Sequence, residues 1–411
     1  MIQTQVELAS RGILTNQVRD VAITEHAPQD VLMGRVARGS VVIMTRGEFS
    51  VGVGEGLRTK VNVNLGTSSV TCDPSEEVKK AIIAEKYGAD TLSDLSMGGD
   101  ISRIRGEIFK NSRLPVTTVP IYQATAEQGI KKLTWDHILE TVGMQAREGV
   151  SSFVFHCVSK EMLALLKSNE RILGVVSKGG SITSAYMLQN QVENPFIEHF
   201  DELLAIMKQY DIVLSLGNTM RSGCIHDPRD KAQVAEMKKN AELAFRAHSA
   251  GVQVIIEGMG GHIRADRIAR YVKYQKKMTP FPLFVAGPLP TDVAMGYDHI
   301  AGCAGASIAS GAGADYLCYI TPAEHLGLPN PEQVREGLIA FRIAAHIGDS
   351  IKYGLSDADA ELASRRADLD FEGQICHAID PERAGEIAPR NGPCTMCGEF
   401  CAIKIMRDYY S

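Results

Sequence analysis

The run Val61-Asn-Val-Asn-Leu65 decides the fold, because a helical stretch and then a second β-rich run follow it directly. The helical stretch covers Glu76–Tyr87, and the second run is Thr91-Leu-Ser-Asp-Leu95. Two strands joined by a helix pair in parallel, since the helix carries the chain back to the end where the first strand began. This unit therefore predicts an α/β fold.

The same alternation continues along the chain and predicts a closed (β/α)8 barrel of the TIM type. The further β-rich runs are Val116–Tyr122, Phe153–His156, Ile172–Val176, Ile212–Leu216, Val252–Ile256 and Leu283–Ala286. Helices are expected between them, among others at Trp135–Glu148, Lys160–Ser168, Asp201–Tyr210 and Ala232–Ala250. Eight such units are what a barrel needs. Tyr316–Ile320 is a ninth strand candidate, and an open doubly wound sheet is the alternative fold.

The regions on either side of the barrel predict three parts. Residues 1–58 are expected to form short helices and a hairpin around Arg46-Gly47, and residues 59–330 the catalytic barrel. Residues 331–411 are expected to form helices and a cysteine-bearing arm. The longest of these helices is Pro331–Tyr353, and shorter ones are expected at Ala358–Asp370 and Pro381–Ile387. In the helix Pro331–Tyr353, the spacing of the apolar residues predicts an inward face made of Val334, Leu338, Phe341 and Ile343.

Composition narrows the class of protein. The chain has 411 residues, 45% of them hydrophobic and 22% charged, which is typical of a soluble globular protein. A formal net charge of −6 argues against a nucleic-acid groove and against a membrane surface as partners. The start of the chain has no signal-peptide pattern, and nine cysteines are present. We therefore expect a reducing, cytoplasmic location with free thiols.

Three of the cysteines stand close together near the end of the sequence, in Cys394-Thr-Met-Cys397-Gly-Glu-Phe-Cys401. Three convergent thiolates are typical ligands of an iron–sulfur cluster. Three cysteines on a four-iron cluster leave one iron open to an outside ligand. The alternative is a zinc site that His377 closes as the fourth ligand.

Polar or glycine-rich residues follow almost every predicted strand. In a parallel barrel the carboxyl ends of all strands meet on one face, where active sites form. Each of these residues alone has an ordinary structural explanation, but together they predict one pocket. They are Asn64, Ser93, Tyr122, His156, Ser177–Ser181, Asn218–Arg221, Glu257 and Gly287.

Two groups of residues near the ends of predicted strands indicate a particular kind of ligand. Ser177-Lys-Gly-Gly-Ser181 offers backbone N–H groups, hydroxyls and a cation, which suits a phosphate at a helix start, and Arg221 would add a charged contact. His262 and His299 each follow a predicted strand, so the pair is a candidate site for a divalent metal. For His299 the alternative is a helix-start residue beside a capping Asp298.

Beyond these patterns, the sequence resembles the phosphomethylpyrimidine synthase family of thiamin biosynthesis, whose members are radical S-adenosylmethionine enzymes. Matching stretches run from about Gly54 to the end of the chain. They include Lys60–Gly66, Gly98–Asp100, Val119–Gln123, Val176–Ser181, Gly287–Leu289, Gly296–Ile300, Thr321–Pro329 and Cys394–Gly398.

The resemblance implies cofactors, partners and site residues. It implies a barrel that binds 5-aminoimidazole ribonucleotide, a [4Fe–4S] cluster on Cys394, Cys397 and Cys401, S-adenosyl-L-methionine, an electron donor and a homodimer. It also implies a divalent metal, which we expect to be zinc, on His299 with His262 as its partner. Glu257 and His156 would move protons. By matching position, the substrate contacts would be Asn64, Ser93, Tyr122, His156, Ser177, Lys178, Gly179, Asn218, Thr219, Met220, Arg221, Glu257 and Phe284.

Departures from the family pattern gather in the expected pocket, at Ser93, Lys178, Asn218–Met220, Phe284 and Met295. His262 also stands one place later than the family's histidine. Because the barrel and cysteine motifs are kept, this pattern predicts the same radical chemistry with a different product. We therefore expect the related 5-hydroxybenzimidazole synthase of cobamide (vitamin B12) lower-ligand synthesis. The alternatives are phosphomethylpyrimidine synthase itself and a non-catalytic barrel with a zinc-binding tail.

Overall fold

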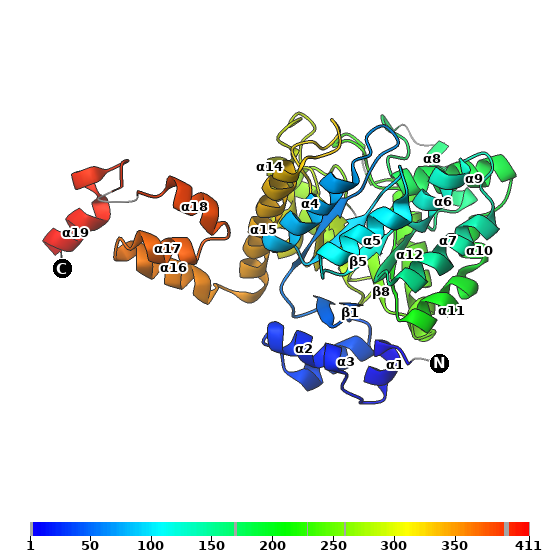
Figure 1. Ribbon diagram of the computed structural model, residues 1–411, viewed down its shortest axis with the longest axis horizontal. Coiled ribbons are helices and arrows are strands. Elements are labelled where there is room, and N and C mark those ends of the chain that lie inside the picture. Colours follow the sequence, from blue (N-terminus) through cyan, green and yellow to red (C-terminus); the bar gives the residue numbers. More distant parts are fainter. Residues whose placement is uncertain (1–2, 168–170, 228, 259, 390–393, 411) are drawn as a thin grey trace. The chain divides into compact units, whose positions relative to one another are not determined.

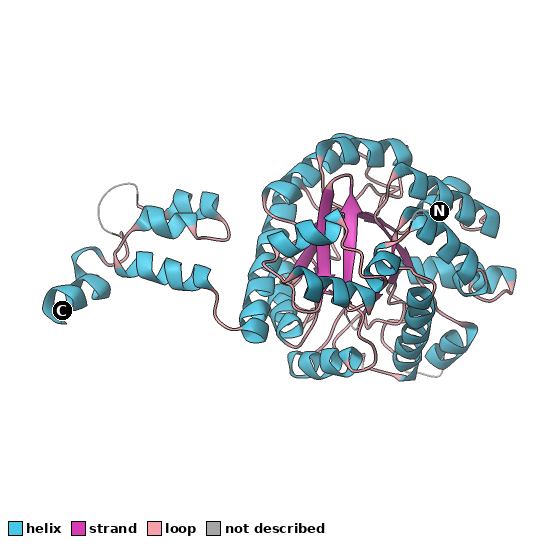
Figure 2. Ribbon diagram, turned by 90° about the horizontal axis from the view of Figure 1, so that it is seen from below, coloured by secondary structure: helices cyan, strands magenta, loops and turns pink. Residues whose placement is uncertain are grey.

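A closed barrel of eight parallel strands forms the centre of the molecule, and helices surround it (Figure 2). The computed structural model describes residues 3–167, 171–227, 229–258, 260–389 and 394–410. Around the barrel the strand order is β10-β3-β4-β5-β6-β7-β8-β9. The predicted α/β class and TIM-type barrel are confirmed. The strands are β3 (Lys60–Leu65), β4 (Thr91–Asp94), β5 (Val116–Thr118), β6 (Ser152–Phe155), β7 (Val213–Leu216), β8 (Val254–Glu257), β9 (Leu283–Ala286) and β10 (Tyr316–Cys318).

Strand β3 shows why the sequence alternates. Val61, Val63 and Leu65 pack in one hydrophobic cluster with residues of the surrounding helices. Asn62 and Asn64 alternate with them, and their amide groups hydrogen-bond to each other, Nδ2 of Asn62 to Oδ1 of Asn64, over 2.9 Å. Since successive side chains of a strand point to opposite faces, the valines form the outer layer and the asparagines face the barrel interior.

One predicted strand is wrong, and the ninth candidate takes its place. Ile172–Val176 is a loop in the structure. The N–H groups of Ile172 and Leu173 donate to the carboxylate of Asp227, at 2.8 and 3.1 Å, and so are not available to a strand ladder. The barrel closes through Tyr316–Cys318 instead, which pairs with β9 on one side and with β3 on the other.

A second expected strand is shorter than its apolar run. The predicted strand Val116–Tyr122 ends at Thr118, and α6 begins at Pro120. Proline has no N–H for a strand ladder and fits the first turn of a helix. Tyr122 therefore lies in the first turn of a helix rather than at the end of a strand.

The helices around the barrel match the predicted periodicity, and Trp135–Glu148 and Pro331–Tyr353 have the expected bounds. Ser168, the end of one expected helix, lies outside the described residues. The helices are α4 (Pro74–Lys86), α5 (Ile101–Asn111), α6 (Pro120–Gln128), α7 (Trp135–Glu148), α8 (Lys160–Lys167), α9 (Lys178–Asn190), α10 (Pro195–Glu198), α11 (Phe200–Tyr210), α12 (Lys231–Ser249), α13 (Ala265–Lys276), α14 (Asp298–Gly311) and α15 (Pro331–Tyr353).

The N-terminal residues cover one end of the barrel. Helices α1 (Gln5–Ser10), α2 (Asn16–Thr24) and α3 (Gln29–Ala37) precede the hairpin of β1 (Val41–Arg46) and β2 (Phe49–Gly54), which was predicted. Val42 and Met44 of the hairpin pack against residues from the barrel strands. The amide group of Gln253 bonds both backbone groups of Ile43, at 2.6 and 3.0 Å. The hairpin thus closes the amino-terminal end of the barrel.

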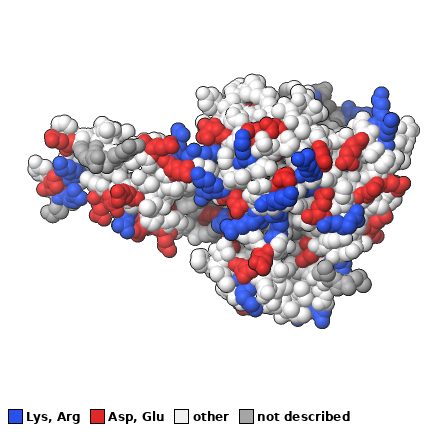
Figure 3. All heavy atoms as spheres, in the orientation of Figure 1, with Lys and Arg blue, Asp and Glu red and all other residues white. Residues whose placement is uncertain are grey.

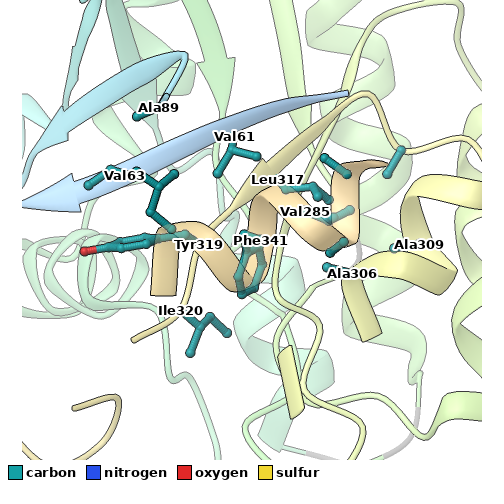
Figure 4. Packing of buried hydrophobic residues seen from close by; sticks show 14 of the residues in the cluster. Val61, Val63, Ala89, Val285, Ala306, Ala309, Leu317, Tyr319, Ile320 and Phe341 are labelled. Carbon is teal, nitrogen blue, oxygen red and sulfur yellow. The ribbon is translucent and has the colours of Figure 1, made fainter. Parts of the chain in front are cut away.

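Helix α15 buries one face against the strands. Figure 4 shows the Phe341 ring in the same cluster as Leu317, Tyr319 and Ile320. Val334 and Leu338 are also buried, as predicted. The prediction for Ile343 is wrong, because its side chain is 38% exposed. Ile343 lies two positions after Phe341, which turns it about 200° around a helix with 3.6 residues per turn.

The chain divides into two compact units, one up to Asp349 and one from Ser350 onward. The second unit contains α16 (Asp357–Ala367), α17 (Phe371–Cys376), α18 (Pro381–Ile387), the 3₁₀ helix η1 (Gly398–Phe400) and α19 (Ala402–Tyr410), which Figure 1 labels in part. Its described helices bury no side chain fully. The predicted helix Ala358–Asp370 is confirmed, with an end three residues earlier.

Charged side chains of both signs are interspersed over the face that Figure 3 shows. Many are paired at the surface, such as Lys79 with Glu76 and Lys110 with Glu107. Within the described part of the chain, no helix combines the length and the apolar character that crossing a membrane requires.

Candidate active site

A cavity of about 360 Å³ lies at the carboxyl ends of the barrel strands. The structure brings together ten of the predicted site residues around it: Asn64, Ser93, Tyr122, His156, Ser177, Asn218, Arg221, Glu257, His262 and Phe284. Other residues complete the lining, among them Leu173, Val176, Cys318, Tyr319, Glu324 and His325. Residues separated by more than 250 positions in the sequence thus share one pocket.

A network of hydrogen bonds fixes the polar residues on β3 and β4. Asn62 Oδ1 accepts bonds from the hydroxyls of Thr91, at 2.9 Å, and Ser93, at 3.1 Å. With its own Nδ2 committed to Asn64, Asn62 sets the orientation of the Asn64 amide. Nδ2 of Asn64 in turn donates to Sγ of Cys318, at 3.0 Å. Asn64 therefore presents a defined amide group at the floor of the cavity.

Aromatic and thiol groups make the neighbouring part of the floor. The Phe284 ring stacks on Tyr316, with centroids 4.1 Å apart. Burial raises the pKa of the Cys318 thiol to about 12, while the bond from Asn64 lowers it. A thiol with such a pKa stays protonated at neutral pH and is a poor nucleophile.

His156 is held by close packing rather than by a hydrogen bond. Its side chain is 4% exposed, and its Nδ1 atom has no partner among the described residues. A Cβ atom at Gly179 would clash with the ring, and one at Gly217 would lie 2.8 Å from it. Burial, with a smaller contribution from Arg221, lowers the pKa of His156 to about 3. The imidazole is therefore neutral at neutral pH.

The predicted anion cluster does begin a helix. Ser177 is the N-cap of α9, and its Oγ accepts the N–H of Gly180 at 3.1 Å. The free N–H groups at a helix start, with the favourable end of the helix dipole, bind anions. The Lys178 ammonium lies 5.3 Å from the centre of the Tyr122 ring. Lys178 and Gly179 are outside the residues that line the cavity, although they flank Ser177, which lines it.

Glu257 joins strand β8 to the loop that follows β7. Its Oε1 accepts the Ser215 hydroxyl and its Oε2 the N–H of Asn218, both at 3.3 Å. Burial raises the pKa of Glu257, and the charge of Arg221 opposes this shift. A carboxyl group whose pKa is shifted toward neutral is suited to proton transfer. Thr219 and Met220 belong to the loop that follows β7, but their side chains are buried and do not line the cavity.

The structure places His325, and not the predicted His299, next to His262. The His262 and His325 rings have centroids 5.1 Å apart, and both residues line the cavity. His299 lies in the first turn of α14, with its Nδ1 buried and without a partner among the described residues. The pair of His262 and His299 thus stays a prediction. The stretch Thr321–Pro329, which matches the family, contains His325, but nothing in the sequence around this histidine indicated that it lies next to His262.

The three cysteines of the second unit lie on one short turn. The N–H of Gly398 donates to the carbonyl of Cys394 at 2.9 Å, and η1 leads from there to Cys401. All three thiols are free, and Cys397 is exposed. Soft thiolate ligands on one turn fit an iron–sulfur cluster chemically. In the described ranges, no three His, Cys, Asp or Glu side chains are already gathered to hold a metal, so the thiols would converge on insertion.

A cavity at the mouth of a (β/α)8 barrel, together with a turn that carries three free thiols, is the combination expected of a barrel enzyme that binds an iron–sulfur cluster. The family model described as the radical SAM ThiC family matches residues 4–408. The chain belongs to this family.

Curated relatives are similar over almost their whole length. "Phosphomethylpyrimidine synthase" of Thermoanaerobacter sp. (strain X514) is 44% identical over 99% of this chain and 98% of its own. The protein of the same name from Methanoregula boonei is 44% identical over 98% and 99%. A third, from Geobacter metallireducens, is 43% identical over 99% and 98%.

The expectation of a 5-hydroxybenzimidazole synthase is therefore wrong, since these relatives carry the name of the alternative. Two of the pocket departures on which that expectation rested keep the chemical character of the site. Lys178 is still a cation beside the start of α9, and Phe284 is still an aromatic ring in the floor. Such replacements alter individual contacts without requiring another reaction.

Proposed function

We propose that the protein is a phosphomethylpyrimidine synthase that acts on 5-aminoimidazole ribonucleotide. The observation that carries this proposal is the similarity to proteins of that name along 99% of the chain. The cavity supports it chemically, because it combines the start of α9 with the Arg221 guanidinium, a pattern that suits a phosphorylated substrate.

The pocket residues take distinct roles in this proposal. The backbone of Ser177 to Gly179, Lys178 and Arg221 would bind the phosphate, and Asn64 and Ser93 would orient the ribose and base. Glu257 would give and take protons, and the neutral His156 ring would contact the substrate. Tyr122, Phe284 and the loop Asn218–Arg221 would enclose the ligand and exclude water.

The cofactors belong to the proposal as well. Cys394, Cys397 and Cys401 would hold a [4Fe–4S] cluster, which with S-adenosyl-L-methionine supplies the radical that starts the rearrangement. We propose His262 and His325 as ligands of a divalent metal, since their rings share the cavity wall. The reaction also needs an external electron donor. A homodimer would allow the cysteine turn of one subunit to reach the cavity of the other.

A product assay tests the proposal. Anaerobically reconstituted protein is incubated with 5-aminoimidazole ribonucleotide, S-adenosyl-L-methionine and dithionite, and the products are separated by liquid chromatography and mass spectrometry. We expect a phosphorylated pyrimidine, together with 5′-deoxyadenosine. Glu257→Gln serves as the inactive control. Turnover of the ribonucleotide to any product other than the pyrimidine would overturn the proposal, as would a fully loaded protein that leaves the ribonucleotide unchanged.

A further inference from the structure

A buried carboxylate outside the cavity holds the loop that follows β7. Glu236 lies on α12, and 2% of it is exposed. Its Oε1 accepts the backbone N–H of Thr219 at 2.8 Å, and its Oε2 accepts that of Met220 at 2.7 Å. Both carboxylate oxygens are thus committed to two successive peptide groups of one turn.

The residues on either side of this turn face the cavity. Asn218 and Arg221 line it, whereas Thr219 and Met220 are fully buried behind it. Nη1 of Arg221 donates to the Asn218 carbonyl at 3.0 Å, and the Asn218 N–H contacts Glu257. The direction of the two middle peptide groups therefore determines where the Asn218 and Arg221 side chains point.

Two further contacts fix the same loop from behind. Nδ2 of Asn240, one helical turn after Glu236, donates to the Gly217 carbonyl at 3.1 Å. Nη2 of Arg171 donates to the Met220 carbonyl at 2.9 Å, while its Nε pairs with Asp230 at 2.5 Å. The carbonyl groups of the loop thus accept hydrogen bonds from the neutral Asn240 and the cationic Arg171. Its two central N–H groups donate to the carboxylate of Glu236.

Stability of the fold alone does not account for a carboxylate at this position. Burial raises the pKa of Glu236 to about 7, although the bonds from Met220 and Thr219 and the charge of Arg221 oppose the shift. Burial thus makes the charged form of Glu236 less favourable in the folded protein than in the unfolded chain. A buried ionisable group adds little stability by itself, and one use of such a group is to fix a local geometry.

We propose that Glu236 is a positioning residue, which holds the turn at Thr219 and Met220 so that Asn218 and Arg221 meet the anionic substrate. The inference rests on the proposed function only for the identity of that substrate. Glu236 itself does not touch the ligand. Its effect is on the substrate affinity of the site, through the loop.

Glu236→Gln tests the proposal, because an amide keeps one acceptor and turns an NH2 group toward the second N–H. Glu242→Gln is the matched control on the same helix, where the side chain is exposed and pairs with Lys239 at the surface. Binding of 5-aminoimidazole ribonucleotide is measured by calorimetry without S-adenosylmethionine, and KM and kcat by the pyrimidine assay. Amide hydrogen exchange of the peptide that contains Thr219 and Met220 reports on the loop.

We expect Glu236→Gln to raise Kd and KM about tenfold, to change kcat less than threefold and to speed exchange in that peptide alone. Glu236→Asp, which keeps the charge, should recover part of the affinity. Kd within twofold of the wild type would overturn the proposal, and so would two variants that both fail to fold, which would show a purely structural role. A wild type that binds the ribonucleotide but makes no pyrimidine would refute the proposed function and leave this test intact.

Discussion

The Nδ1 atom of His262 lies 2.6 Å from Oδ1 of Asp292. Asp292 is itself fixed, because its carboxylate also accepts the N–H of Ile225 at 3.0 Å. A carboxylate at this distance keeps the proton on Nδ1, so the lone pair of Nε2 is free to bind a cation. The neighbouring ring of His325 makes a two-histidine site possible on that side.

Replacing Asp292 should therefore weaken metal binding without removing a ligand. We expect Asp292→Ala to lower the affinity for Zn²⁺ about tenfold or more, since such supporting carboxylates orient the imidazole. Zinc binding is measured by competition with a chelating dye, in a background with serine at positions 394, 397 and 401 so that the thiols do not contribute. Asp266→Ala, at an exposed surface pair with Arg264, is the control. Equal affinities would contradict this role.

The cysteine turn should be essential for the first chemical step. We expect Cys397→Ala to lose iron and to abolish reductive cleavage of S-adenosyl-L-methionine, because a cluster site with two thiolates is incomplete. Formation of 5′-deoxyadenosine and iron content are the measurements. Cys376→Ala removes another exposed thiol from the same unit and should leave both unchanged. Cleavage that persists in Cys397→Ala would rule out the cluster assignment.

The contact between Gly179 and His156 should tolerate no added methyl group. A side chain at Gly179 would meet the imidazole, which is packed on its other side by Gly217. We expect Gly179→Ala to cost about 1–3 kcal/mol of unfolding free energy, as overpacking does, and to weaken substrate binding. Thermal unfolding and ribonucleotide binding are the measurements. Gly106→Ala, in α5 with open space at its Cβ position, should not be destabilising.

The depressed pKa of His156 gives stability a definite pH dependence. The unfolded chain binds a proton on this histidine near pH 6.5, while the folded protein does so only near pH 3, so stability falls as pH drops between these values. At pH 5 this contribution reaches about 2 kcal/mol. His156→Asn removes it, so its deficit in Tm relative to the wild type should shrink from pH 7.5 to pH 5. The exposed His226→Asn is the control, and a constant deficit for His156→Asn would contradict the prediction.

The sequence predicted the barrel because strands such as Val61–Leu65 carry their own pattern of alternation. It failed at Ile172–Val176, whose composition is equally typical of a strand. There the deciding partner is Asp227, a residue more than 50 positions later, which takes the N–H groups that a ladder would need. Strand propensity depends on the local sequence, whereas the hydrogen bonds to Asp227 depend on a residue that is distant in the sequence.

The candidate site shows the same limit. Residues at strand ends, such as Asn64 and Glu257, could be placed in one pocket because barrel topology determines where they meet. His325 follows the last strand at a distance, and only its ring contact with His262 reveals it. Glu236 was missed for a related reason, since it lies in the middle of a helix and reaches the cavity only through backbone groups of another segment.

The β1–β2 hairpin has a consequence for the catalytic cycle. Because Val42 and Met44 close the amino-terminal end of the barrel, ligands enter and leave the cavity through its opposite, carboxyl-terminal end. Under the proposed function, the pyrimidine therefore has to leave before the next ribonucleotide can bind.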